Sequence, residues 1–145
     1  MKRVLALDVG DKRIGIAISD PLGFTAQGLM TYNRCGDPVE DAAYIRGIAE
    51  RYAPVKLLFG MPRNMDGSYG GAAEKVKSFS ALVMEGLDVE CDFYDERLTT
   101  VTAEKVLYDA RMDWKKRRKV VDKLAAVVIL QGYLDYLHNQ NEGFV

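Results

Sequence analysis

The sequence is poor in the side chains that bind zinc or act as thiol and imidazole catalysts. It contains one histidine, His138, and two cysteines, Cys35 and Cys91, which are 56 positions apart and form no Cys-x-x-Cys pair. A zinc site built from cysteine and histidine is therefore excluded, and we expect two free thiols. Any metal must be bound by aspartate and glutamate oxygens, which are ligands typical of Mg²⁺ or Mn²⁺.

The sequence also lacks a long hydrophobic run. Its longest uncharged hydrophobic stretch, Leu124 to Leu134, covers 11 positions and is too short to cross a bilayer as a helix. The start Met1-Lys2-Arg3 is like that of a signal peptide, but Asp8 interrupts the next apolar run and no small-residue cleavage site follows. We therefore expect a cytoplasmic protein without a membrane partner.

Neither sign of charge predominates. The chain has 20 lysines and arginines against 21 aspartates and glutamates, a net charge of −1. Five of the basic residues follow one another from Lys115 to Lys119, so the rest of the chain carries 15 basic against 21 acidic residues. This balance excludes a general polyanion binder, although a basic segment beside an acidic site can still attract nucleic acid.

Periodicity predicts a strand-rich start and an alternating continuation. Apolar runs bounded by turn residues predict strands at 3–9, 13–19, 25–32, 55–59 and 89–94. Asp37 and Pro38 predict a capped helix with an inner stripe of Ala42, Ile45, Ala49 and Tyr52. Further helices are expected at about 71–85, after Thr99 or Thr100, and at about 120–137.

The predicted order is therefore βββαβαβαα. Short turns join the first three strands into antiparallel hairpins, and strands separated by single helices imply right-handed parallel crossovers. Because no repeat or linker divides the chain, we expect residues 1–145 to form a single domain. Its fold class is α/β, with a mixed five-stranded sheet flanked by helices.

Asp8 is an unusual residue for a buried strand. A carboxylate within an apolar strand is costly unless it is paired, neutralised or bound to a metal, although a strand end can also simply reach water. Strand alternation places Asp8 on the same face as Val4 and Ala6. The carboxyl end of a strand is also where open α/β sheets bind ligands.

Two further acidic positions are candidates for the same site. Asp95 and Glu96 follow the strand at 89–94 and point to opposite faces, so only one can share the face of Asp8. Arg97 could instead pair with either carboxylate. Asp122 shares a helical face with Ala125, Ala126 and Ile129, although a first-turn aspartate can also serve only the helix dipole. Three carboxylates at one sheet edge can bind two hard cations for phosphodiester hydrolysis.

The sequence resembles a known family at four motifs spread over nearly its full length. They are Asp8-Val9-Gly10-Asp11-Lys12-Arg13-Ile14-Gly15, Gly60-Met61-Pro62 with Asn64-Met65-Asp66-Gly67, Asp95-Glu96-Arg97-Leu98-Thr99-Thr100, and Asp122-Lys123-Leu124-Ala125-Ala126 with Ile129-Leu130. Together they resemble the YqgF-type family of the ribonuclease H-like superfamily. Its members are bacterial proteins described as pre-16S rRNA nucleases and earlier as Holliday-junction resolvases.

The resemblance implies a ribonuclease H-like fold, a cytoplasmic location and a catalytic metal site. It favours Glu96 over Asp95, so that Asp8, Glu96 and Asp122 would be both the catalytic residues and the ligands of Mg²⁺ or Mn²⁺. The implied activity is endonucleolytic hydrolysis of structured nucleic acid, with the 5′ end of pre-16S rRNA as the leading substrate and the ribosome or its assembly intermediates as further partners.

Several polar residues could contact the substrate. Arg13 and Arg97 lie close in sequence to the acids and could hold phosphate oxygens, or form local ion pairs instead. Asn64, in the loop at 63–68, could contact a phosphate or only shape the turn. Lys115, Lys116, Arg117, Arg118 and Lys119 could guide a nucleic-acid backbone beside Trp114, which could stack on a base, or form a solvated and mobile segment.

Other functions also fit the sequence. One alternative is a resolvase acting on branched DNA, and another is a non-catalytic factor that binds RNA or the assembling ribosome. A third is an actin-like or sugar-kinase-like nucleotide binder, because Asp8-x-Gly10 with Gly15 resembles a phosphate loop of that related fold. Such proteins close two lobes around ATP, which a single domain of 145 residues cannot do.

Overall fold

The computed structural model describes residues 3–61, 70–95 and 114–142, and the side chains of residue 95 and of 114–122 and 139–142 lie outside this description. The predicted helix after Thr99 or Thr100 falls on 96–113 and is likewise outside the described residues. The elements in chain order are β1 (Val4–Val9), β2 (Arg13–Ser19), β3 (Ala26–Asn33), α1 (Pro38–Tyr52), β4 (Lys56–Met61), α2 (Gly71–Met84), β5 (Glu90–Asp95) and α4 (Trp114–Glu142).

The five strands form one mixed sheet in the order β3-β2-β1-β4-β5. The first three strands are antiparallel neighbours, with Asp8 opposite Gly15 between β1 and β2. The pairs β1–β4 and β4–β5 are parallel. The predicted mixed sheet, with three antiparallel strands followed by parallel ones, is therefore confirmed.

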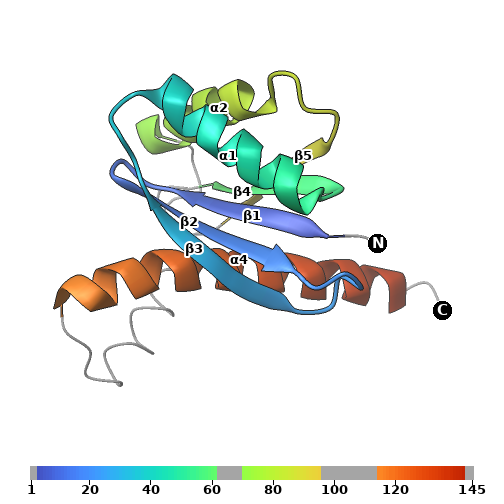
Figure 1. Cartoon of the computed structure of the whole chain (residues 1–145). Helices are drawn as coiled ribbons and strands as arrows, with labels where there is room; N and C mark the ends of the chain where they lie inside the picture. The colour runs from blue at the N-terminus through green and yellow to red at the C-terminus, as the bar shows by residue number, and fades with distance from the viewer. Residues whose placement is uncertain (1–2, 62–69, 96–113, 143–145) are drawn as a thin grey trace.

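Helices cover both faces of the sheet, as Figure 1 shows, with α1 and α2 on one face and α4 across the other. Alternation along β1 divides its side chains between the two layers. Leu5 and Leu7 pack in the core beneath α1 and α2, whereas Val4 and Ala6 pack against Ala126 and its neighbours on α4. Asp8 follows the second set, so it belongs to the face covered by α4.

Helix α1 begins as its sequence predicts. The side chain of Asp37 accepts a hydrogen bond from the amide of Val39, and Pro38 occupies the first helical position, where no intrahelical partner is lost. Ala42, Ile45 and Ala49 are buried as expected. Asp41, in the same first turn, is also completely buried, which the amphipathic pattern did not indicate.

Helix α4 begins earlier than predicted, and this corrects two expectations. It starts at Trp114 instead of about Val120, so the backbone of the segment from Lys115 to Lys119 is helical. Lysine and arginine are good helix formers, which allows the basic run to extend the helix. Asp122 consequently lies eight residues beyond the helix start, and its interpretation as a first-turn residue is wrong.

Among the described residues, no helix has the length and apolar character needed to span a membrane.

Candidate functional site

The candidate acidic site begins with Asp8, near the carboxyl end of the central strand β1. Asp8 is half-buried and lies opposite Gly15 of β2, which in turn lies opposite Thr31 of β3. Because Gly15 has no side chain, the sheet surface next to Asp8 is left low on that side.

Alternation along β5 divides its residues between the two faces of the sheet. The hydroxyl of Tyr133 on α4 donates to Asp92 at 3.0 Å, and Tyr94 packs against the α4 core cluster. These two positions of β5 thus share the α4 face. Asp95 is in register with Met61, which belongs to the opposite core cluster. The backbone register therefore puts position 95 in the row of the α1–α2 face, and Glu96 lies outside the described residues.

Helix α4 lies close against the sheet just beyond Asp122. Ala125 and Ala126 are 1% and 0% exposed, and Ile129 is also fully buried. Small side chains at the contact allow the helix backbone to approach the strands closely. Asp122 is one helical turn before Ala126 on the same row of α4, so the helix carries it toward the layer that contains Asp8.

The described side chains do not test the complete carboxylate triad. Among them, no three histidine, cysteine, aspartate or glutamate residues form a group able to bind a metal. Glu96 and the side chain of Asp122 lie outside the described part of the chain, so the site of Asp8, Glu96 and Asp122 remains a prediction. Its donor set, three carboxylates, has the hard oxygen chemistry that Mg²⁺ and Mn²⁺ require.

The predicted substrate contacts are only partly described. Arg13 is the first residue of β2 and is half-buried; with Gly15 and Ala17 it belongs to the face of Asp8. Asn64 and Arg97 lie outside the described residues. The backbones of Lys115, Lys116, Arg117, Arg118 and Lys119 form early turns of α4, whereas their side chains are not described.

The structure contains a second polar cluster, which the sequence reasoning missed. Asp41 is 0% exposed, and its carboxylate accepts hydrogen bonds from Arg34 Nε at 2.9 Å, Tyr32 Oη at 2.9 Å and the Cys35 amide at 3.1 Å. Burial would raise the pKa of Asp41, but these hydrogen bonds outweigh it and lower that pKa. Burial, together with the Asp41 charge, raises the pKa of Tyr32 to about 12.

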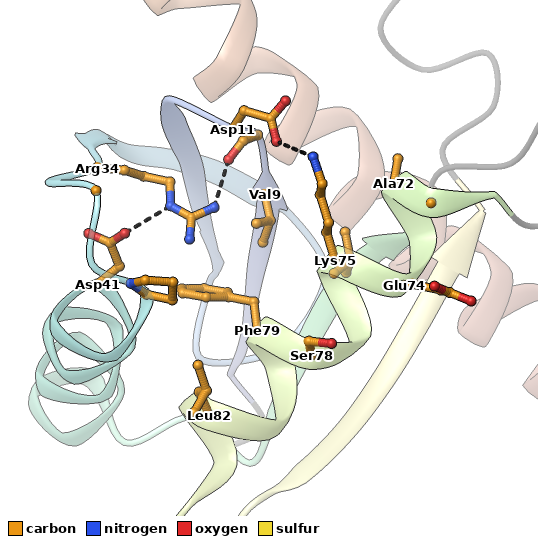
Figure 2. Close-up of a pocket in the computed structure, with 15 residues that line it drawn as sticks. Val9, Asp11, Arg34, Asp41, Ala72, Glu74, Lys75, Ser78, Phe79 and Leu82 are labelled. Carbon is orange, nitrogen blue, oxygen red and sulfur yellow. Dashed lines mark hydrogen bonds and ion pairs between the residues drawn. The ribbon is translucent and has the colours of Figure 1, made fainter.

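This cluster adjoins an open pocket of about 1090 Å³ on the α1–α2 face, shown in Figure 2. The pocket lies between the β1–β2 turn, the start of α1 and the first turns of α2. An ion pair between Lys75 and Asp11, at 3.5 Å, reaches across it, and both side chains are largely exposed. Val9 lines this pocket, whereas Asp8 belongs to the other face, so the pocket is separate from the acidic site.

The two cysteines are free, as expected from their spacing. Cys35 and Cys91 are both exposed and unpaired with each other.

Comparison with known proteins gives consistent results across sequence families and curated relatives. The model of the family RuvX, described as Holliday junction resolvase, matches residues 2–136. A Clostridium botulinum protein named "Putative pre-16S rRNA nuclease" is 49% identical over 135 residues, covering 93% of this chain and 98% of the relative. A protein of the same name from Halothermothrix orenii is 49% identical over 134 residues, covering 92% and 95%.

Solved structures support the fold. Thermus thermophilus RuvC matches with a TM-score of 0.56 at 12% identity, covering 94% of this chain and 96% of that one. The same protein in complex with a Holliday junction substrate matches with a TM-score of 0.52 at 15% identity, covering 89% and 92%. At these identities the likeness concerns the ribonuclease H-like fold, which is thereby confirmed.

Proposed function

This chain belongs to the RuvX Holliday junction resolvase family and is accordingly a nuclease, and we propose that it hydrolyses phosphodiester bonds in structured RNA, at the 5′ end of precursor 16S rRNA. This substrate is proposed because relatives that are 49% identical over more than nine-tenths of the chain share the name "Putative pre-16S rRNA nuclease". On this proposal, its partners are the precursor rRNA and the ribosome or its assembly intermediates, and its location is the cytoplasm.

We propose that Asp8, Glu96 and Asp122 are the catalytic residues and bind Mg²⁺ or Mn²⁺. Asp8 supports this role by its place near the end of β1, on the α4 face and beside a glycine. For Asp122, the support is its position on α4, four residues before the buried Ala126. For Glu96, the support is the pairing of Asp95 with Met61, which puts position 95 in the row of the opposite face. When bound, a divalent cation lowers the pKa of an attacking water and stabilises charge on the leaving oxygen.

The remaining proposed residues bind and orient the substrate. Arg13, on the face of Asp8, would hold a phosphate oxygen through its planar guanidinium group, and Arg97 and Asn64 would add contacts. Lys115, Lys116, Arg117 and Arg118 would attract the nucleic-acid backbone along the start of α4. Because such contacts release counterions, binding should weaken steeply with added salt.

The test is cleavage of precursor rRNA, unstructured RNA and four-way DNA junctions by purified protein with Mg²⁺ or Mn²⁺. Asp8→Asn preserves the side-chain shape and removes the charge, so cleavage should be lost. Asp92→Asn is the matched control, because Asp92 is likewise a strand aspartate on the α4 face, but it belongs to β5, level with Ala6, and accepts a hydrogen bond from Tyr133. Equal cleavage by wild type and Asp8→Asn would refute the proposed catalytic role.

A second candidate substrate is branched DNA, which the Holliday junction resolvase activity for which the RuvX family is named favours. Preferential cleavage of four-way junctions over precursor rRNA in the same assay would select it. Salt-sensitive binding without turnover, unaffected by Asp8→Asn, would instead identify a binding factor.

A further inference from the structure

We infer that Arg34 is a positioning residue for the acidic site, because it fixes the β1–β2 turn and thereby the strand end that carries Asp8. This inference rests on the proposed role of Asp8. Arg34 follows β3 and lies on the opposite side of the sheet from Asp8, so it acts through the backbone and has no direct contact with a reacting group.

The turn needs support because β1 is held unevenly near its end. Pairing of β1 with the parallel strand β4 covers Val4 to Leu7, whereas pairing with β2 continues through Val9. Beyond Leu7, the backbone pairing of β1 is with β2, so the contacts that fix the β1–β2 turn also help to position Asp8.

Arg34 contacts this turn through both its backbone and its side chain. Its amide donates to the carbonyl of Lys12 at 2.8 Å, and its Nη1 donates to the carbonyl of Gly10 at 2.9 Å. The Gly10 amide in turn donates to the Arg13 carbonyl at 2.9 Å. A β-carbon at Gly10 would lie 2.9 Å from that same oxygen, so the turn tolerates no side chain there.

The guanidinium group is itself held by both helices of the α1–α2 face. Its Nε donates to the buried Asp41 of α1, and its Cζ lies 4.7 Å from the ring centroid of Phe79 on α2. The Arg34 and Asp41 side chains are only 15% and 1% exposed. Figure 2 shows Arg34 between the turn, Asp41 and Phe79. One planar side chain thus joins the turn to two helices.

This geometry requires arginine, which makes Arg34→Lys an informative variant. An ammonium group can neutralise Asp41, but it cannot reproduce the fork that donates to Asp41 and to the Gly10 carbonyl in fixed directions. The variant should therefore keep a counter-charge for Asp41 while the turn loses its support.

The expected results concern metal affinity, kinetics and backbone exchange. Removing a group that orients a metal ligand typically costs about 10–100-fold in affinity or activity, and we expect about tenfold here. In calorimetry with Mn²⁺ alone, Arg34→Lys should bind about tenfold more weakly, and kcat should fall by about the same factor with KM little changed. Without metal, the amides of residues 9–13 should exchange faster than in the wild type.

Lys56→Met is the matched control, because Lys56, like Arg34, is a cation that links neighbouring elements through a polar network. Lys56 begins β4, at the far end of the sheet from Asp8, and contacts Tyr133 and Asp92. It should lower stability but leave Mn²⁺ affinity unchanged. If Arg34→Lys does not fold, Phe79→Leu retains both ionic groups and removes only the ring, and its affinity should fall about two- to fivefold.

Wild-type Mn²⁺ affinity and kcat in the Arg34 or Phe79 variant, with Asp8→Asn inactive, would overturn the positioning role alone. Equal Mn²⁺ binding by Asp8→Asn and the wild type would instead overturn the proposed site.

Discussion

The buried carboxylate of Asp41 gives the sharpest stability prediction. Asp41 is completely buried, and four donors share its two oxygens: Arg34 on Oδ2, and Tyr32, the Cys35 amide and the Cys35 thiol on Oδ1. In Asp41→Asn only one oxygen remains. The new amide nitrogen can take either position. If it faces Arg34, two hydrogen-bond donors face each other; if it faces Cys35, the backbone amide of Cys35 loses its acceptor.

Either orientation also leaves the mostly buried Arg34 guanidinium without its counter-charge. Removing one partner of a buried ion pair costs about 3–5 kcal/mol of folding free energy. Because asparagine keeps one oxygen as an acceptor, we expect Asp41→Asn to lower the free energy of unfolding by about 3 kcal/mol, the low end of that range. Asp37→Asn is the control, because it makes the same chemical change four residues earlier. Asparagine caps a helix about as well as aspartate, so the control should change the free energy of unfolding by less than about 0.5 kcal/mol.

Urea unfolding at pH 7 measures both variants, and its pH dependence checks the cause. The folded pKa of Asp41 is lowered, so its contribution is fully present above the unfolded value near 3.9 and is lost as the pH falls through the folded pKa. The gap between wild type and Asp41→Asn should therefore narrow below about pH 4. A loss under about 1 kcal/mol at pH 7, or a gap independent of acid, would refute this reasoning.

Three further substitutions have defined outcomes in urea unfolding. Gly10→Ala should cost about 1–3 kcal/mol because its β-carbon would meet the Arg13 carbonyl at 2.9 Å, and a neutral result would mean that the turn can shift. Tyr133→Phe should cost about 1 kcal/mol by removing the hydroxyl that donates to Asp92, and an unchanged midpoint would assign that bond no net value. Ala126→Leu should cost about 1–3 kcal/mol by overpacking the contact between α4 and the sheet, and it should also reduce cleavage, whereas full activity would show that the spacing of α4 is not critical.

Much of the fold follows from local patterns in the sequence. The alternation of Ile14, Ile16 and Ile18 and the cap at Asp37 each depend on residues close in the chain, and the structure confirms both. The face of Asp8 follows from the same alternation. The predicted start of α4 near Val120 was wrong, because lysine and arginine favour the helix and extend it back to Trp114.

The ionic cluster around Asp41 could not be predicted in the same way. Its position in the first turn of α1 has a sufficient local explanation in the helix dipole, and nothing in the local pattern indicates burial. The contact with Arg34 and Tyr32 depends on how the end of β3 packs over α1, which is a tertiary feature. Strand alternation alone also left the choice between Asp95 and Glu96 open, because the face of a strand-end residue depends on the register of β5 with β4.

The helical state of the basic segment also constrains how the proposed nuclease meets its substrate. Asp122 lies three residues beyond Lys119 and seven beyond Lys115 in one continuous helix. At about 1.5 Å per residue, these positions are about 4.5 and 10.5 Å from Asp122 along the axis. A flexible basic tail could hold a phosphate backbone at many distances from the acids, whereas a helix offers only a narrow range. On the proposed function, the bond that is cleaved must therefore lie within a few nucleotides of the phosphates held by this segment.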